Sequence, residues 1–472
     1  MPVDQTHPQY RLWAPAWRKC RDVAQGQDRI HAAGTAYLPA LSGQSPQEYA
    51  AYQGRALFYN ATGRTIDGLS GLVFRKPPLV RAPEGMTAFL RDVDAAGLSL
   101  QGFAERLVED LLQVGRAGIL VDYSAGSSAR LTARQARGLG RRVIWTAYGA
   151  EDIIDWRWEL LWGARVLTQV RVRERLTLAG ELDEFDRREE EQVRVLELVS
   201  DGEGGGRPYY RQRLFRRGRQ GWQAVEEIVP RRQGAPLDFI PFVFVGPRDT
   251  TPGVDKPPLL DLVQVNLSHY TLMADYRHGL HFTGLPTPVV TGHHHDPSEG
   301  ELKIGSGTAW VFGEPEARAF FLEFKGSGLG AMKAELEALE SRMALLGSRA
   351  LAPEKRAAET AEAAAIHRSG EQSLLASLAT AVSLALERAL EITRDWGGYG
   401  QGEVGVQLNT DYLAQPLDAA GLSALVKSLQ AGALSWESFV YNLARGELLP
   451  PGRTAARERE LIAAEDKDRD SA

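Results

Sequence analysis

The chain has 472 residues, of which 43% are hydrophobic and 25% are charged, the composition of an ordinary soluble globular protein. This length predicts about three domains with a large buried core. The net charge of −6 excludes a wide surface that binds duplex DNA tightly, because basic residues that neutralise phosphates supply most of that affinity. Transient contact with DNA through local basic loops is still compatible with this net charge. Cys20 is the only cysteine, which excludes a disulfide framework and a cysteine-rich zinc site and favours a reducing cytoplasm. The first residues lack a basic segment followed by an apolar run, so we expect no secretory signal.

The N-terminal part predicts a long helix that begins at Ser45. Ser45 can cap a helix, Pro46 suits the first helical position, and Glu48 completes the pattern of a capping box. Apolar residues then keep helical spacing as far as Val73, with a weaker centre at Gly63. We therefore expect one helix over this stretch.

The middle of the first half predicts a helix followed by a β-rich region. The helix covers about Leu100–Val114, and the short apolar run Ile119–Tyr123 predicts a strand after it. Residues 144–245 are β-rich, and between residues 171 and 219 they contain 12 basic and 11 acidic residues among 49. So dense a mixture predicts solvated strand faces and projecting hairpin loops. The predicted strands are Val166–Leu178, Val193–Val199, Tyr209–Phe215 and Phe242–Val245.

Beyond Pro257-Pro258 the pattern changes to two long helices around a small β-type insert. Leu259–Phe282 predicts a helix about 36 Å long at 1.5 Å per residue. Gly328–Leu346 predicts a second helix, and the insert between the two contains predicted strands at Pro286–Thr291, Thr308–Phe312 and Ala319–Phe324. The second helix carries apolar residues spaced alternately by three and four, a heptad seam that calls for packing partners. These residues are Leu329, Met332, Leu336, Leu339, Met343 and Leu346.

The C-terminal third predicts mainly helices. A loop over residues 347–359 carries the basic residues Arg349, Lys355 and Arg356, and a long helix follows at Thr360–Trp396. Its uncharged stretch Ser373–Leu386 is shorter than the roughly 20 apolar residues that cross a bilayer, so it predicts a buried helix. A strand is expected at Val404–Asn409, helices at Ala419–Ala431 and Ser435–Arg445, and frayed chain over the last 20 residues.

No motif in the sequence predicts a catalytic centre. The glycine-rich Gly202–Gly206 lacks the Lys-Ser/Thr of a phosphate-binding loop. The only metal-like cluster is His293, His294, His295 and Asp296, with His278 and His281 upstream. Consecutive histidines of a strand point to opposite faces and do not all reach one ion, so a solvated loop tip is the favoured interpretation. We therefore expect no catalytic, cofactor-binding or metal residues.

Several sequence blocks together resemble one protein family. They are RALFYNATGRTIDGLSGLVFRKPP (55–78), GRAGILVDY (115–123), IPFVFVG (240–246), PPLLDL (257–262), Asn266, His269-Tyr270, ADYRH (274–278) and LPTP (285–288). This set is similar to the portal proteins of tailed bacteriophages, in the branch long labelled as a domain of unknown function. The resemblance covers about residues 45–412.

The resemblance implies an α+β, mainly α, portal fold that assembles as a ring. It implies a wing, a stem of two helices, a small β-type clip between them, a channel loop and a helical crown. The boundaries would be 1–256 for the N-terminal part of the wing, 257–282 for stem helix 1, 283–324 for the clip, 325–346 for stem helix 2, 347–359 for the channel loop, 360–412 for the long helix and strand of the wing, and 413–472 for the crown.

The resemblance also implies a function without enzymatic activity or cofactor. A portal ring, usually of twelve subunits, sits at one capsid vertex of the virion and is assembled in the cytoplasm of the host bacterium. Double-stranded DNA is packaged and ejected through its channel without sequence readout. The terminase large subunit, the head-to-tail adaptor, the major capsid protein and the scaffolding protein would be its partners, and no membrane would be involved.

The implied contacts fall on three sets of residues. Arg349, Lys355 and Arg356 would touch the phosphate backbone in the channel. The heptad seam would pack against neighbouring subunits. The clip residues that would meet terminase or adaptor are His293, His294, His295, Asp296 and Glu299.

Two alternative functions stay open at this point. A metal-dependent enzyme centred on His278, His281 and His293–His295 predicts a stoichiometric metal and a monomer or dimer with a closed pocket. Another head-completion or scaffold protein would also oligomerise, but it need not form an axial channel.

Overall fold

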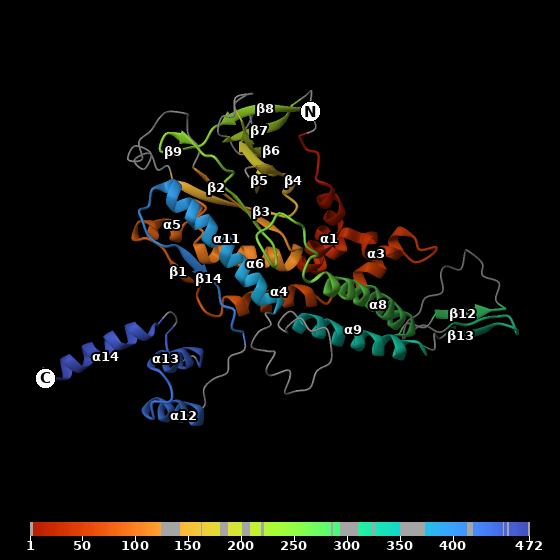
Figure 1. Cartoon of the computed structure of the whole chain (residues 1–472). Helices are drawn as coiled ribbons and strands as arrows, with labels where there is room; N and C mark the ends of the chain where they lie inside the picture. The colour runs from red at the N-terminus through yellow and green to blue at the C-terminus, as the bar shows by residue number, and fades with distance from the viewer. Residues whose placement is uncertain are drawn as a thin grey trace. The chain divides into compact units, whose positions relative to one another are not determined.

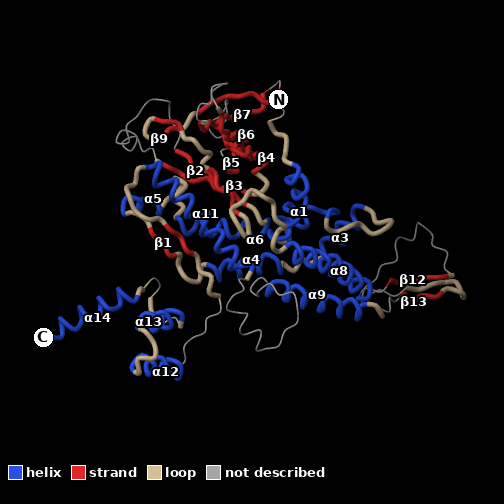
Figure 2. The backbone as a smooth tube through the Cα atoms, in the orientation of Figure 1, coloured by secondary structure: helices blue, strands red, loops and turns tan. Residues whose placement is uncertain are grey.

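In the computed structural model the chain consists of two compact units. Figure 1 labels helices and strands along the whole chain. Unit 1 consists of Met1–Ala24, Thr62–Asp261 and Leu346–Ala472, and unit 2 of Gln25–Ala61 and Leu262–Leu345. The structure describes residues 3–123, 142–161, 163–179, 187–200, 208–218, 221–284, 287–292, 310–322, 326–349, 373–412, 419–446, 448–450 and 453–470. Helices and antiparallel strands occur together, as the α+β prediction requires (Figure 2).

Unit 1 is built around a three-stranded antiparallel sheet in the order β11-β2-β3. One face of this sheet packs against helices α6 and α11. On that face Nε1 of the buried Trp145 donates a 2.8 Å hydrogen bond to Oγ1 of Thr393 on α11. The strands are β2 (Ala117–Tyr123), β3 (Val143–Gly149) and β11 (Phe242–Val245). The helices of this unit before residue 400 are α1 (Pro8–Gln25), α4 (Ala61–Val73), α5 (Thr87–Arg91), α6 (Leu100–Val114) and α11 (Leu374–Gly397), with a 3-10 turn at Glu84–Met86.

Helix α6 shows how local sequence positions this core. The Ser99 side chain accepts a hydrogen bond from the Gly102 amide and begins the helix. Apolar residues at helical spacing bury its inner face, including Phe103 against Trp145. Gly115 ends the helix with φ +70°, where a Cβ would also lie 3.2 Å from Cδ of Pro258. Glycine is therefore required there by backbone conformation and by space.

The other face of the three-stranded sheet meets a five-stranded antiparallel sheet in the order β4-β5-β6-β7-β8. Tyr148 of β3 donates to Glu174 of β5 (2.6 Å), and Gln212 of β7 donates to Asp122 of β2 (3.0 Å). The far side of the five-stranded sheet is covered by the start of the chain, where Val3 packs with Ile154, Val193 and Val195. The strands are β4 (Ile153–Leu161), β5 (Ala164–Ala179), β6 (Arg187–Val199), β7 (Tyr209–Gly218) and β8 (Gly221–Ile228). Two small sheets pair β1 (Leu79–Arg81) with β14 (Gly405–Gln407) and β9 (Arg231–Arg232) with β10 (Ala235–Pro236).

The charged residues of the five-stranded sheet correct one prediction. Solvated strand faces were expected, but strand pairing buries several of these side chains in ion pairs. Arg194 contacts Glu174 at 2.7 Å, and Glu197, only 7% exposed, contacts Arg211 at 2.7 Å. Burial of a charge is costly unless it is paired, so these contacts explain why the dense mixture of charges is tolerated within a sheet.

Unit 2 is formed by helices from two distant parts of the chain and one β-hairpin. It contains α2 (Gln27–Ala33), a 3-10 turn (Gly34–Ala36) and α3 (Pro46–Arg55). It also contains most of α8 (Leu260–Gly284) and α9 (Leu329–Arg349), together with β12 (Thr287–Thr291) and β13 (Arg318–Leu322). The capping box of Ser45 and Glu48 is present as predicted.

The helix predicted from Ser45 to Val73 is two helices, α3 and α4, because residues 56–60 are not helical. Two side chains from distant segments supply hydrogen bonds to this break. The Phe58 amide donates to Oε1 of Gln27 (3.1 Å), and Nδ2 of Asn266 donates to the Tyr59 carbonyl (2.8 Å). The buried Phe58 ring packs against Tyr270. Tertiary contacts therefore override the helical periodicity of the sequence.

Three further predictions need correction. The helix predicted over Thr360–Trp396 is not continuous, because α11 begins at Leu374 with the extended Ser373 as its cap; residues 360–372 lie outside the described part. Residues 310–312 form no strand, and residues 308–309 of that predicted strand are not described. The last residues were expected to fray, but α14 (Ala455–Asp470) is a helix. It follows α12 (Ala419–Gln430) and α13 (Trp436–Arg445), and Nε1 of Trp436 donates to the Ala455 carbonyl at 3.2 Å.

The helix over Ser373–Leu386 is buried as predicted, since most of its side chains are covered within unit 1. Among the residues described, no helix combines the length and apolar character that a bilayer crossing needs.

Candidate functional site: the two-helix module

The segment Leu260–Arg349, with α8, β12, β13 and α9, is named here the two-helix module. Its helices are antiparallel neighbours, as two contacts at different heights indicate. A Cβ on Gly279 of α8 would lie 2.8 Å from Cδ2 of Leu329, near the start of α9. Ten residues earlier on α8, which is nearly three helical turns, Nε2 of His269 lies 3.3 Å from Oε1 of Glu340. With 25 and 21 residues, the helices are about 37 Å and 31 Å long at 1.5 Å per residue.

One face of α8 is buried and includes polar residues. Its buried positions recur at helical spacing and are Leu262, Val263, Asn266, His269, Tyr270 and Ala274. Asn266 binds the Tyr59 carbonyl, and His269 joins α8 to α9 through Glu340. Burial lowers the pKa of His269 below its ordinary value, and the hydrogen bond to the Glu340 carboxylate opposes that change. His269 is therefore held mainly as a neutral ring that fixes the two helices in register.

The heptad seam of α9 is partly used within the single chain. Leu336, Leu339 and Met343 are buried, whereas Leu329, Met332 and Leu346 are half-buried. The opposite surface of α9 carries exposed charged side chains, among them Lys333 near Glu337 and Arg342 near Glu335. Whether the seam also contacts a neighbouring subunit stays a prediction, which would rely on its half-buried members.

The β12–β13 hairpin extends the module between the two helices. Its strands pair antiparallel, with Val289 opposite Phe320 and Pro288 opposite Phe321. Phe320, Phe321 and Leu322 are 50%, 56% and 61% exposed, so apolar side chains lie open on both faces of the hairpin. An isolated two-stranded hairpin is marginally stable in water, so these faces favour a partner.

The structure places only some of the site residues predicted from sequence. Arg349 is the last residue of α9, and its side chain lies outside what is described. The basic residues Lys355 and Arg356, and the clip residues His293, His294, His295, Asp296 and Glu299, also lie outside the described residues.

The upstream histidines of the metal hypothesis both lie on α8. Nδ1 of His278 is 3.4 Å from Nη2 of Arg55, and the His281 ring lies beside Phe282. Across the described ranges, histidine, cysteine and carboxylate side chains do not gather in any group of three or more that could hold a metal ion. The metal hypothesis therefore rests on residues 293–295, which the described ranges do not include.

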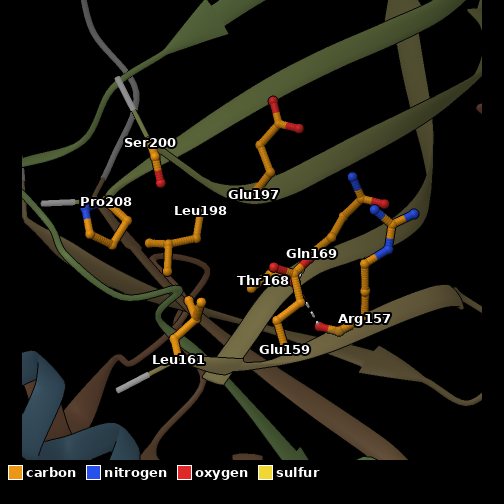
Figure 3. Close-up of a pocket in the computed structure, with 9 residues that line it drawn as sticks. All are labelled: Arg157, Glu159, Leu161, Thr168, Gln169, Glu197, Leu198, Ser200 and Pro208. Atoms are coloured by element: carbon orange, nitrogen blue, oxygen red, sulfur yellow. Dashed lines mark hydrogen bonds between the residues drawn. The ribbon is translucent and has the colours of Figure 1, made fainter. Parts of the chain in front are cut away.

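A pocket of about 200 Å³ lies at one end of the five-stranded sheet in unit 1 (Figure 3). Polar side chains dominate its wall, and two of them already have partners. Glu197 is paired with Arg211 and Arg213, and the Thr168 hydroxyl is bound to the Arg157 carbonyl at 3.3 Å. The pocket contains none of the functional-site residues predicted from sequence. Its lining residues are Arg157, Glu159, Leu161, Thr168, Gln169, Glu197, Leu198, Ser200 and Pro208.

Sequence reasoning missed the polar contacts between α3 and α8. Tyr52 donates to Asp275 (2.6 Å), and Arg55 contacts His278. The available signal was spacing, because the two polar residues of each helix are three residues apart and therefore lie on one helix face. No local pattern says, however, that two helices more than 200 residues apart in sequence meet.

Comparisons with known proteins give two results for this geometry. The family model described as "Domain of unknown function (DUF4055)" matches residues 258–397, which include the whole two-helix module. No curated protein matches the sequence.

Among solved structures, the chain is similar to three from gene transfer agent (GTA) particles. A chain of the virion of the native particle has 13% identity and a TM-score of 0.36, with 87% of this chain and 94% of that chain covered. A chain of the neck of the empty particle, computed with C6 symmetry, has 14% identity and a TM-score of 0.39, with coverage of 90% and 99%. A chain of the neck of the native particle, computed with C12 symmetry, has 15% identity and a TM-score of 0.39, with coverage of 85% and 94%.

Proposed function

We propose that this chain is a bacteriophage portal subunit, which forms a ring around a channel for double-stranded DNA at one vertex of the capsid. The observation that carries the proposal is the two-helix module. Two long antiparallel helices flank a β-hairpin, and the sequence blocks of the portal resemblance run through α8 into β12. In this proposal residues 257–282 and 325–346, which contain most of α8 and α9, are the stem, and residues 283–324 are the clip.

The remaining parts of the chain take the other portal roles. Residues 1–256 and 360–412 form the wing, residues 347–359 the channel loop and residues 413–472 the crown. The exposed apolar side chains of Phe320, Phe321 and Leu322 support an assembled state for the clip, because a monomer leaves them in water. The half-buried seam residues of α9 would add contacts between stems.

Charge supports a conduit rather than a DNA clamp. The chain carries a net charge of −6, so most of a channel wall would repel phosphate and let DNA slide. Arg349, Lys355 and Arg356 of the channel loop would supply the few contacts to the phosphate backbone. The clip residues His293–His295, Asp296 and Glu299 would face terminase during packaging and the adaptor afterwards.

The purified chain tests this proposal through its mass in solution and negative-stain electron microscopy. We expect a closed ring of about twelve subunits with a central hole, since a heterologous interface whose rotation closes generates a ring and the portal resemblance implies twelve subunits. A chain that stays monomeric at high concentration and binds one metal ion per chain would favour the enzyme alternative. A closed oligomer without an axial hole would favour another head-completion protein.

The channel-loop role has a separate test in the assembled particle. The triple variant Arg349→Ala/Lys355→Ala/Arg356→Ala should assemble rings but package or retain less DNA, because the phosphate contacts are gone. The matched control Lys333→Ala/Arg342→Ala removes basic side chains from the exposed surface of α9. Packaging and genome retention at the wild-type level in the triple variant would show that the channel-loop assignment is wrong.

A further inference from the structure

Two pairs of polar side chains face each other between α3 and α8 in unit 2. Tyr52 and Arg55 are three residues apart on α3, and Asp275 and His278 have the same spacing on α8. Residues three apart share one face of a helix. The Tyr52 hydroxyl donates a 2.6 Å hydrogen bond to Oδ1 of Asp275, and Nη2 of Arg55 lies 3.4 Å from Nδ1 of His278. The two helices therefore present matched pairs in parallel register.

The contact between Arg55 and His278 depends on the protonation state of the imidazole. A guanidinium carries only N–H donors, so Nδ1 of His278 has to be the acceptor and the ring has to be neutral. A protonated imidazole has N–H groups on both nitrogens and accepts no hydrogen bond. It would also place a second positive charge close to Arg55, where Nη2 and Nδ1 are 3.4 Å apart. Protonation thus converts an attraction into a repulsion.

The surroundings of His278 favour its neutral form. Burial lowers its pKa below the ordinary 6.5, Arg55 and His281 lower it further, and Asp275 opposes them. From α9 the apolar Leu329 approaches Gly279 on this part of α8, and the charged groups that act on the pKa of His278 are Arg55, His281 and Asp275, which lie on α3 and α8. Nε of Arg55 is buried and has no hydrogen-bond partner in the described structure. Loss of the imidazole contact therefore adds to the unsatisfied hydrogen-bonding capacity of the Arg55 guanidinium.

We propose that the Arg55–His278 contact is an acid-sensitive clasp, which holds α3 against α8 at neutral pH and loosens on mild acidification. A histidine whose pKa is lowered by folding contributes stability above its unfolded value of about 6.5. That contribution is lost as the pH falls below this value, since the unfolded chain then binds the proton more readily. The clasp lies within one chain and does not rest on the proposed portal function.

Amide hydrogen exchange of α3 (Pro46–Arg55) tests the clasp, with intrinsic exchange rates corrected for pH. Between roughly pH 7.5 and 5.5 the protection of wild-type α3 should fall about two- to fivefold, the size expected for a partly exposed charge pair. In His278→Asn an amide oxygen replaces Nδ1 as acceptor and takes up no proton, so this additional loss should disappear. The matched control His281→Asn, on the same helix, keeps the Arg55–His278 contact and should still lose protection of α3 on acidification.

A direct titration supplies the second measurement. By NMR, Arg55→Gln should raise the pKa of His278 toward its ordinary value, because a neighbouring cation is removed. The clasp is refuted if wild-type α3 shows no loss of protection, if His278→Asn loses protection equally, or if Arg55→Gln leaves the pKa of His278 unchanged.

Discussion

The hydrogen bond between Trp145 and Thr393 makes a quantitative prediction for the core of unit 1. Both residues are buried, with exposures of 1% and 0%, and the Thr393 hydroxyl accepts from Nε1 of Trp145 at 2.8 Å while donating to the Ala389 carbonyl. Thr393→Val keeps the shape of the side chain and removes the acceptor. The indole N–H is then buried without a partner, which costs about 1–3 kcal/mol.

The matched control is Thr380→Val on the same helix. The Thr380 hydroxyl also donates to the carbonyl four residues before it, at 2.8 Å from Ala376, but it accepts from no tryptophan. Valine and threonine have similar helix propensities, so the control should change stability by less than about 0.5 kcal/mol. Urea unfolding by circular dichroism, together with hydrogen exchange of β3 (Val143–Gly149), measures both variants. Equal effects of the two substitutions would refute the reasoning.

Three further predictions concern packing, capping and reactivity. Gly118→Ala should lower the free energy of unfolding by about 1–3 kcal/mol in urea, because the new Cβ would lie 2.7 Å from Cε1 of Phe242. Gly68→Ala in α4, where a Cβ would meet no atom within 4 Å, should raise it by up to about 1 kcal/mol. A change of the same sign in both variants would contradict the packing. Ser373→Ala should lower the free energy of unfolding by about 1 kcal/mol, since the Ser373 side chain accepts a hydrogen bond from the Ala376 amide at 3.1 Å and caps α11. The control Ser377→Ala, inside the helix, should cause no measurable loss of stability. Burial raises the pKa of the Cys20 thiol to about 12, so maleimide at pH 8 should label it only in urea, and rapid labelling of the folded chain would contradict its burial.

The sequence predicts elements whose signals are local. The capping box at Ser45, the helices α6, α8 and α9, and the strands β5 to β7 follow from spacing and capping patterns within about 25 residues. The start of α11 was misplaced because a serine inside a helical pattern is equally compatible with a cap. The tertiary environment decides between the two.

Features that depend on distant residues could not be predicted. The break between α3 and α4 is stabilised by Gln27 and Asn266, which no pattern around residue 58 reveals. Likewise, the ion pairs of the five-stranded sheet arise from strand register, which places Arg194 of β6 beside Glu174 of the neighbouring strand β5. In the candidate site the helices were predicted, whereas the α3–α8 contacts require the fold itself.

The most direct test of the proposed portal function is a cryo-electron microscopy reconstruction of the purified assembly. It should resolve a ring in which α8 and α9 of every subunit line an axial channel wide enough for duplex DNA, with β12 and β13 of neighbouring subunits in contact at one end. An assembly in which α8 and α9 lie at the periphery, or in which no channel runs along the axis, would contradict the proposal.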